Sequence, residues 1–188
     1  MRKRMLIFCG LAILVAGLGQ VAPAADPAPL ALEPGKAIDG LRITLGRAAK
    51  GDLEVGFENV DAKPVVLNLG DMVGNGLELE PRRFHLVVTG PTGKSRELHW
   101  KGIGGIAGRM DDFLVPLMPA AKYTVTFSLG DLIGNGKEGN WSSAIVAGEK
   151  VQAVYEGAAP SLTNRQEIIP ALPIWLGKIE SGLLVYSE

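Results

Sequence analysis

The sequence has little cysteine, little histidine and no excess of charge of one sign. Of 188 residues, one is cysteine and two are histidine, and 19 basic residues face 20 acidic ones, for a formal net charge of −1. Without a basic excess the chain cannot displace counterions from phosphates, so nucleic-acid binding is excluded. Because Cys9 lies in the leader described next, a mature chain has neither a disulfide nor a thiolate metal site.

The first 24 residues have the three parts of a cleavable secretory signal. Basic residues occupy positions 2–4, an uncharged apolar run covers 5–19, and Ala22-Pro23-Ala24 is a small-x-small cleavage site. We therefore expect a bacterial protein exported to the periplasm or beyond, cleaved after Ala24 and not inserted in a membrane afterwards. An uncleaved anchor is the alternative, although it needs roughly 20 apolar residues to cross the hydrocarbon core.

Beyond the leader, the composition divides the chain once more. Residues 25–36 are rich in alanine and proline and indicate an extended tether. Residues 37–188 carry the fold, and a segment of that size buries a core without covalent staples. We expect one domain there, with two tandem domains that divide near Lys101 as the alternative.

Apolar residues alternate with polar ones along much of this region, which is typical of strands with one buried face. Clusters of Gly, Pro, Asn and Asp separate the runs, as expected between short antiparallel strands. The pattern predicts an all-β, antiparallel, immunoglobulin-like sandwich of about nine strands, with a closed β-barrel as the alternative. One short helix is expected over 161–169. The predicted strands are 41–45, 53–57, 65–69, 84–88, 123–129 and 151–155, and less regular ones are 97–100, 113–117 and 183–186.

Two segments resemble small bacterial secreted domains of the immunoglobulin-like and fibronectin-like kind. Leu117 to Tyr123 has the Leu-x-Pro-x-x-x-Tyr form of a tyrosine corner, and the strand over 148–155, followed by Trp175 to Ser181, is similar to the closing hairpin of these domains. The resemblance implies a sandwich in which the hydroxyl of Tyr123 bonds back to the chain upstream. It implies no function, because folds of this kind carry many unrelated ones.

One motif occurs twice, as LGDMVGNG over 69–76 and as LGDLIGNG over 129–136. Each copy follows an alternating strand, and Asn-Gly favours tight turns, so we expect two equivalent strand-exit turns. The alternative is a calcium site built from the oxygens of Asp71, Asn75, Asp131 and Asn135. Because calcium takes six to eight oxygen ligands and the spacing is not that of an EF-hand, we expect no cofactor.

The glycine-rich segment 101–109 contains Gly-x-Gly-x-x-Ala, which superficially matches a dinucleotide fingerprint. That fingerprint needs a helix after it to receive the pyrophosphate, whereas a strand is expected here, so nucleotide binding is excluded. Loops of this kind often carry binding residues on a rigid sandwich. We therefore treat Arg109, Asp111 and Asp112 as candidate partner contacts, and a turn held by Arg109 and Asp112 is the structural alternative.

Histidine and tryptophan supply the remaining candidates. His85 and His99 are out of phase with the apolar positions of their strands, which predicts two surface residues or one cross-strand pair. A zinc site needs three or four converging ligands, which two histidines do not supply by themselves. Trp141 lies in a polar segment and is the candidate aromatic platform for a glycan, whereas Trp175 is expected to fill the core.

No catalytic constellation is present in recognisable form. A Gly-x-Ser-x-Gly elbow is missing. Carboxylates such as Glu78 and Glu80 could form a glycosidase pair, but the distance that decides this is not given by the sequence. We therefore predict a non-catalytic binding or structural module whose partner is a secreted or envelope protein. A carbohydrate-binding module and a calcium-stabilised adhesion-type domain are the alternatives, followed by a hydrolase.

Overall fold

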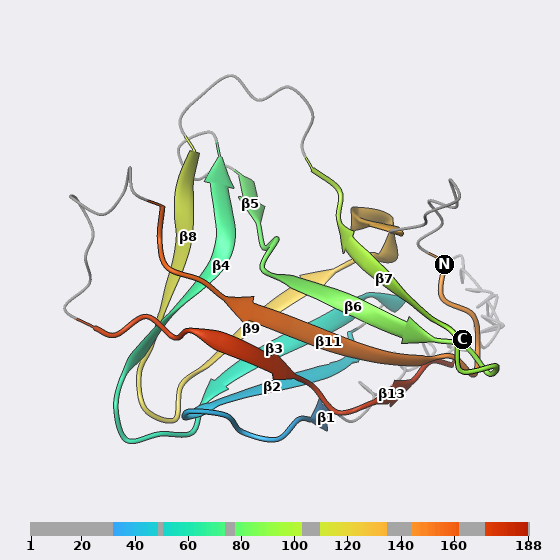
Figure 1. Cartoon of the computed structure of the whole chain (residues 1–188), viewed down its shortest axis with the longest axis horizontal. Helices are drawn as coiled ribbons and strands as arrows, with labels where there is room; N and C mark the ends of the chain where they lie inside the picture. Colours follow the sequence, from blue (N-terminus) through green and yellow to red (C-terminus); the bar gives the residue numbers. More distant parts are fainter. Residues whose placement is uncertain are drawn as a thin grey trace, which may run out of the picture.

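Three antiparallel sheets make up the described part of the chain (Figure 1). The structure, a computed structural model, describes residues 32–48, 51–73, 78–102, 110–134, 144–161 and 172–187. Within these ranges, no helix is long and apolar enough to span a membrane. The fold is the predicted all-β sandwich, and its sheets do not close into a barrel. The expected leader and nearly all of the expected helix over 161–169 lie outside the described residues.

Sheet A has the order β1-β2-β3-β9. Its strands are β1 (Glu33–Pro34), β2 (Leu41–Arg47), β3 (Leu53–Asn59) and β9 (Lys122–Phe127). The alternating apolar residues of β2 and β3 are fully buried, as the sequence pattern predicts. Strand β9 forms one end of the sheet and pairs with β3.

Sheet C has the order β10-β7-β6-β11-β12, and β13 also pairs with β11. Its bounds are Leu132–Gly134 for β10, Ser95–Trp100 for β7, Phe84–Thr89 for β6, Lys150–Gly157 for β11, Gly177–Glu180 for β12 and Leu184–Val185 for β13. The pairing of β11 with β12 joins the two segments that the sequence suggested as a closing hairpin.

Sheet B is the smallest and has the order β5-β4-β8. It consists of β5 (Glu78–Glu80), β4 (Val65–Val73) and β8 (Met110–Leu117). The register between β4 and β8 shifts between Asn68 and Asp71. Gly70 lies in this bulge with φ +141°, and an added Cβ there would collide with the carbonyl oxygen of Glu80, so glycine is required.

The core lies between sheets A and C and extends under sheet B. Its large rings form a continuous series, because Phe57 of sheet A contacts both Phe84 and Tyr155 of sheet C, with ring centroids 6.1 and 5.2 Å apart. Trp175 stacks on Tyr155 at 5.5 Å and is 4% exposed, which confirms the prediction that it fills the core.

Buried polar groups fasten sheet B to sheet C. The side-chain oxygen of Asn68 accepts from the amide of Gly70 at 3.1 Å, and the hydroxyl of Tyr155 donates to the backbone carbonyl of Asn68 at 3.0 Å. Asn68 and Tyr155 are both fully buried. Burial raises the pKa of the Tyr155 hydroxyl, which therefore stays protonated as the donor.

The two copies of the repeated motif adopt different conformations. Residues 69–73 continue β4 through its bulge, whereas Leu129–Asp131 form a 3-10 helix that leads directly into β10. The expectation of two equivalent strand exits is therefore wrong for these residues. The Gly-Asn-Gly part of each copy falls outside the described residues.

Candidate functional site

An apolar cavity of about 320 Å³ lies where the three sheets meet. Strand β9 of sheet A forms one wall, and residues of β5 and β8 from sheet B form the opposite wall. Trp100, the last residue of β7, contributes from sheet C. We call this cavity the junction groove.

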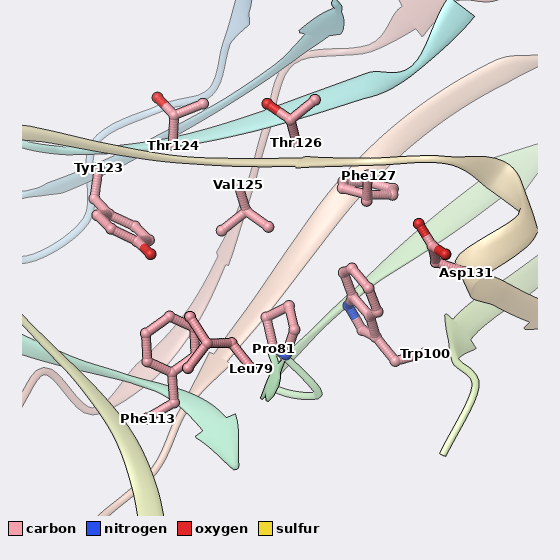
Figure 2. A pocket seen from close by; sticks show the side chains of 10 residues that line it. All are labelled: Leu79, Pro81, Trp100, Phe113, Tyr123, Thr124, Val125, Thr126, Phe127 and Asp131. Carbon is pink, nitrogen blue, oxygen red and sulfur yellow. The ribbon is translucent and has the colours of Figure 1, made fainter. Parts of the chain in front are cut away.

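The wall formed by β9 separates apolar from polar side chains by strand alternation. Figure 2 shows Tyr123, Val125 and Phe127 pointing towards the cavity, whereas Thr124 and Thr126 point away from it. All five residues nevertheless line the cavity. The two threonines therefore face it through their backbone, which means that the groove follows the edge of β9.

Aromatic and aliphatic groups form the opposite wall and one end. Leu79, Pro81 and Phe113 lie across the cavity from Val125 in Figure 2, and Leu79 is 46% exposed. Trp100 packs against Phe127, with ring centroids 5.3 Å apart. Its indole Nε1 is buried and finds no acceptor among the described residues. An unpaired buried donor is costly, and it marks this end of the groove as unusual for a protein core.

Charged groups surround the mouth at the Trp100 end. A second cavity of about 320 Å³ shares Leu79, Trp100 and Asp131 with the junction groove and is also lined by Glu78, Glu80 and Lys101. Carboxylates therefore outnumber ammonium groups at this rim. Glu80 is buried and ion-paired with Arg82, whereas Glu78 and Asp131 are exposed.

The outer edge of β9 carries backbone groups that sheet A does not use. Within the described residues, β9 pairs with β3 alone. The amide of Asn59 donates to the carbonyl of Ala121 at 3.0 Å, which sets the phase of the ladder. Because bonded and non-bonded residues alternate in an antiparallel pair, the odd-numbered residues of β9 face β3. Thr124 and Thr126 therefore present their N–H and C=O groups to the junction groove.

The structure gives the predicted acidic residues separate structural roles. Asp71 in β4 lies opposite Glu80 on one side and Asp112 on the other, and Arg82 lies 3.7 Å from its carboxylate. Asp112 accepts from the side chain of Asn68 at 3.2 Å and from the amide and hydroxyl of Ser161 at 2.8 and 3.0 Å.

Asp131 and Asp111 do not lie opposite Asp71. Asp131 accepts from the amide of Ser128 at 2.8 Å, which closes the 3-10 turn at the rim of the junction groove. Asp111 lies opposite Met72 in the β4–β8 ladder. The described residues contain no group of three or more His, Cys, Asp or Glu side chains arranged to hold a metal ion. The other candidates, Asn75, Arg109, Asn135 and Trp141, lie outside the described residues.

The two histidines form a pair across β6 and β7. Their rings stack with centroids 5.0 Å apart, and His99 Nε2 lies 3.0 Å from a carboxylate oxygen of Glu97. Partial burial and the neighbouring imidazole of His99 lower the pKa of His85. The predicted cross-strand pair is therefore present, on strands whose other face packs in the core.

Of the residues that line the junction groove, Asp131 was among the predicted site residues, and the others were not. Trp100, Phe113, Tyr123 and Phe127 each have the spacing of ordinary strand residues, and only their convergence from three sheets creates a cavity. Tyr123 packs edge-on against Phe113 at 6.2 Å, and its hydroxyl makes no hydrogen bond to the described residues, so the expected tyrosine-corner bond is not formed among them. Comparison with known proteins finds no family model, no curated protein and no solved structure that matches this chain.

Proposed function

We propose that this chain is an exported, non-catalytic binding module that takes up apolar side chains of a polypeptide partner in the junction groove. The observation that carries the proposal is the aromatic cavity at the meeting point of three sheets, with an exposed leucine on its wall. Binding sites are commonly concave, mainly apolar and equipped with a few polar groups. The Trp100 Nε1, which has no acceptor among the described residues, and the rim carboxylates are such groups.

A protein partner is favoured over a glycan by the arrangement of the rings. Sugars are bound by stacking on an open aromatic face. Trp100, however, is wedged against Phe84 and Phe127, with centroids 5.6 and 5.3 Å away. The groove therefore offers ring edges and aliphatic groups, which suit apolar side chains. The rim is acidic overall, so a basic group next to those side chains would add to the affinity.

The test uses capped single residues as probes and the Trp100 indole N–H as a reporter. We expect N-acetyl-phenylalanine amide and N-acetyl-leucine amide to shift the NMR signals of the Trp100 indole and the Leu79 methyl groups in the purified protein. N-acetyl-glycine amide, which has no side chain, and the disaccharide maltose are expected to leave both signals in place.

Two matched variants locate the binding. Leu79→Asp puts a charge on the groove wall and is expected to weaken binding of the phenylalanine probe about tenfold, which corresponds to about 1.4 kcal/mol of lost apolar contact. Leu183→Asp changes a leucine of similar exposure outside the groove, 52% against 46%, and is expected to leave binding unchanged. Equal effects of the two variants, or equal shifts with the glycine probe, would contradict the proposal.

A further inference from the structure

The edge of β9 differs from the other sheet edges in the described part of the chain. Sheet edges are commonly protected by being short, by charged residues or by proline. Strands β1, β5, β10 and β13 have two or three residues, β12 has four of which two are charged, and β8 contains Asp111, Asp112 and Pro116. Strand β9 has six residues, Lys-Tyr-Thr-Val-Thr-Phe, and its one charged residue, Lys122, stands at its start. The five residues that follow are β-branched or aromatic, which favours strand pairing, and the described residues supply β9 with one neighbour.

The junction groove lies along that same edge, so two kinds of contact become available together. Thr124 and Thr126 present backbone donors and acceptors, and the side chains of Tyr123, Val125 and Phe127 form an apolar wall beside them. An added strand places alternate side chains on the two faces of the sheet. The side chains on its inner face would enter the groove between Val125 and the opposite wall of Leu79 and Phe113.

We propose that the partner segment is an extended peptide that adds to β9 as a fifth strand of sheet A, antiparallel to it. This rests on the proposed function, because it specifies how the same groove is filled. The peptide has apolar side chains at alternate positions, which occupy the groove, and polar side chains between them, which face solvent beside Thr124 and Thr126. Main-chain hydrogen bonds hold the strand, and the groove selects the alternate side chains.

For a strand that is antiparallel to β9, the charges at the rim indicate which end of the peptide carries a basic residue. The carboxylates of Glu78 and Asp131 lie near the C-terminal end of β9, where Phe127 meets Trp100. In an antiparallel pair, the N-terminal end of the added strand lies at the C-terminal end of β9. A basic residue at the N-terminal end of the peptide is therefore complementary to this rim.

The probe that tests this is the peptide acetyl-Arg-Phe-Thr-Leu-Thr-Val-amide. It is compared with two isomers of itself that carry two N-methyl groups each, at different backbone nitrogens. Residues opposite Thr124 and Thr126 have their N–H directed at β9, and those opposite Val125 have it directed away. Methylating the nitrogens of both peptide threonines is expected to weaken binding at least about twentyfold. Methylating those of phenylalanine and leucine is expected to weaken it less than about threefold. The parent peptide should also protect the amides of Thr124 and Thr126 from hydrogen exchange.

Two further comparisons test the protein edge and the charge. Thr124→Pro removes one N–H from the free edge, a position where proline is tolerated, whereas Thr124→Val keeps it. The proline variant is expected to lose at least about tenfold in peptide affinity and the valine variant little, and urea unfolding of both variants confirms that they fold. Replacing the peptide arginine by glutamate is expected to weaken binding about fivefold at low salt.

The outcomes separate this inference from the proposed function. If the two methylated isomers bind equally, strand addition is overturned, while uptake of side chains by the groove stands. If the capped amino acids bind and the peptide does not, strand addition is again overturned. If neither binds, both proposals fail. If the protein self-associates with exchange protection at Thr124 and Thr126, the occupant is a second copy of this chain and the heterologous peptide is overturned.

Discussion

The hydrogen bond between Tyr155 and Asn68 gives the sharpest stability prediction. The hydroxyl lies 3.0 Å from the carbonyl oxygen, and both residues are fully buried. Tyr155→Phe keeps the ring contacts with Phe57 and Trp175 at 5.2 and 5.5 Å and removes one oxygen atom. The carbonyl then loses a donor where water cannot replace it, so we expect a loss of about 2 kcal/mol in the free energy of unfolding. For a chain of this size that lowers Tm by about 4 to 8 °C.

Urea unfolding monitored by circular dichroism measures this loss, and Tyr123→Phe is the matched control. The Tyr123 hydroxyl makes no hydrogen bond to the described residues, so its removal is expected to change stability by less than about 0.5 kcal/mol.

Alkaline pH gives a second readout, which reports the burial of the same hydroxyl. Burial raises the pKa of Tyr155 in the folded state above its ordinary value of 10.0, so stability falls as pH rises above that value. Tyr155→Phe should lack this part of the decline. Equal effects of the two substitutions on stability at neutral pH would refute the reasoning.

Two further predictions concern the pH dependence of stability and the bulge. Arg96 donates to both oxygens of Glu149 at 2.6 and 2.8 Å and lowers the pKa of that carboxyl, so its contribution is present at neutral pH and is lost as pH falls through the lowered value. Glu149→Gln should cost about 2 kcal/mol at neutral pH and give a shallower acid decline in urea titrations. Gly70→Ala should cost about 3 kcal/mol or more, because its Cβ meets the backbone of Glu80. Gly93→Ala, with φ +79° and open space around it, should cost about 1 kcal/mol in the same unfolding assay.

Local alternation was sufficient to predict most of the strands. The runs at β2, β3, β6 and β11 place every second residue in the core, and the buried residues of these strands follow the expected positions. The strands β1, β5 and β10 were missed, because two or three residues contain too little of the period to be recognised. Strand β1 lies within residues 25–36, which were predicted as a tether, yet it pairs with β2 in sheet A.

The repeated motif shows where local sequence is insufficient. Leu69-Gly70-Asp71 and Leu129-Gly130-Asp131 are identical, yet one is a bulged strand and the other a 3-10 turn. The difference comes from their surroundings. Gly70 is packed under the backbone of β5 and its amide donates to the side chain of Asn68, whereas in the second copy Asp131 accepts from Ser128, which occupies the position equivalent to Asn68.

The junction groove depends even more on the tertiary structure. Most of its residues come from β5, β7, β8 and β9, and its aromatic residues have the pattern of core residues in their own strands. The cavity exists because β8 and β9, which are joined by a short turn, enter different sheets. The spacing of residues within one strand does not show which sheet that strand enters. The sequence analysis selected polar loops as candidates, whereas the candidate site in the structure lies along an apolar strand edge.

The strand order has a consequence for how this chain folds. Each sheet joins strands that lie far apart in sequence, since β3 pairs with β9, β4 with β8 and β6 with β11. Closing such long loops costs entropy before any contact repays it, so proteins with many distant pairings fold slowly. Sheet C lacks β11, which pairs with β6, β12 and β13, until residues 150–157 have been synthesised. Sheet C can therefore form only late in synthesis, whereas every strand of sheets A and B ends before residue 128.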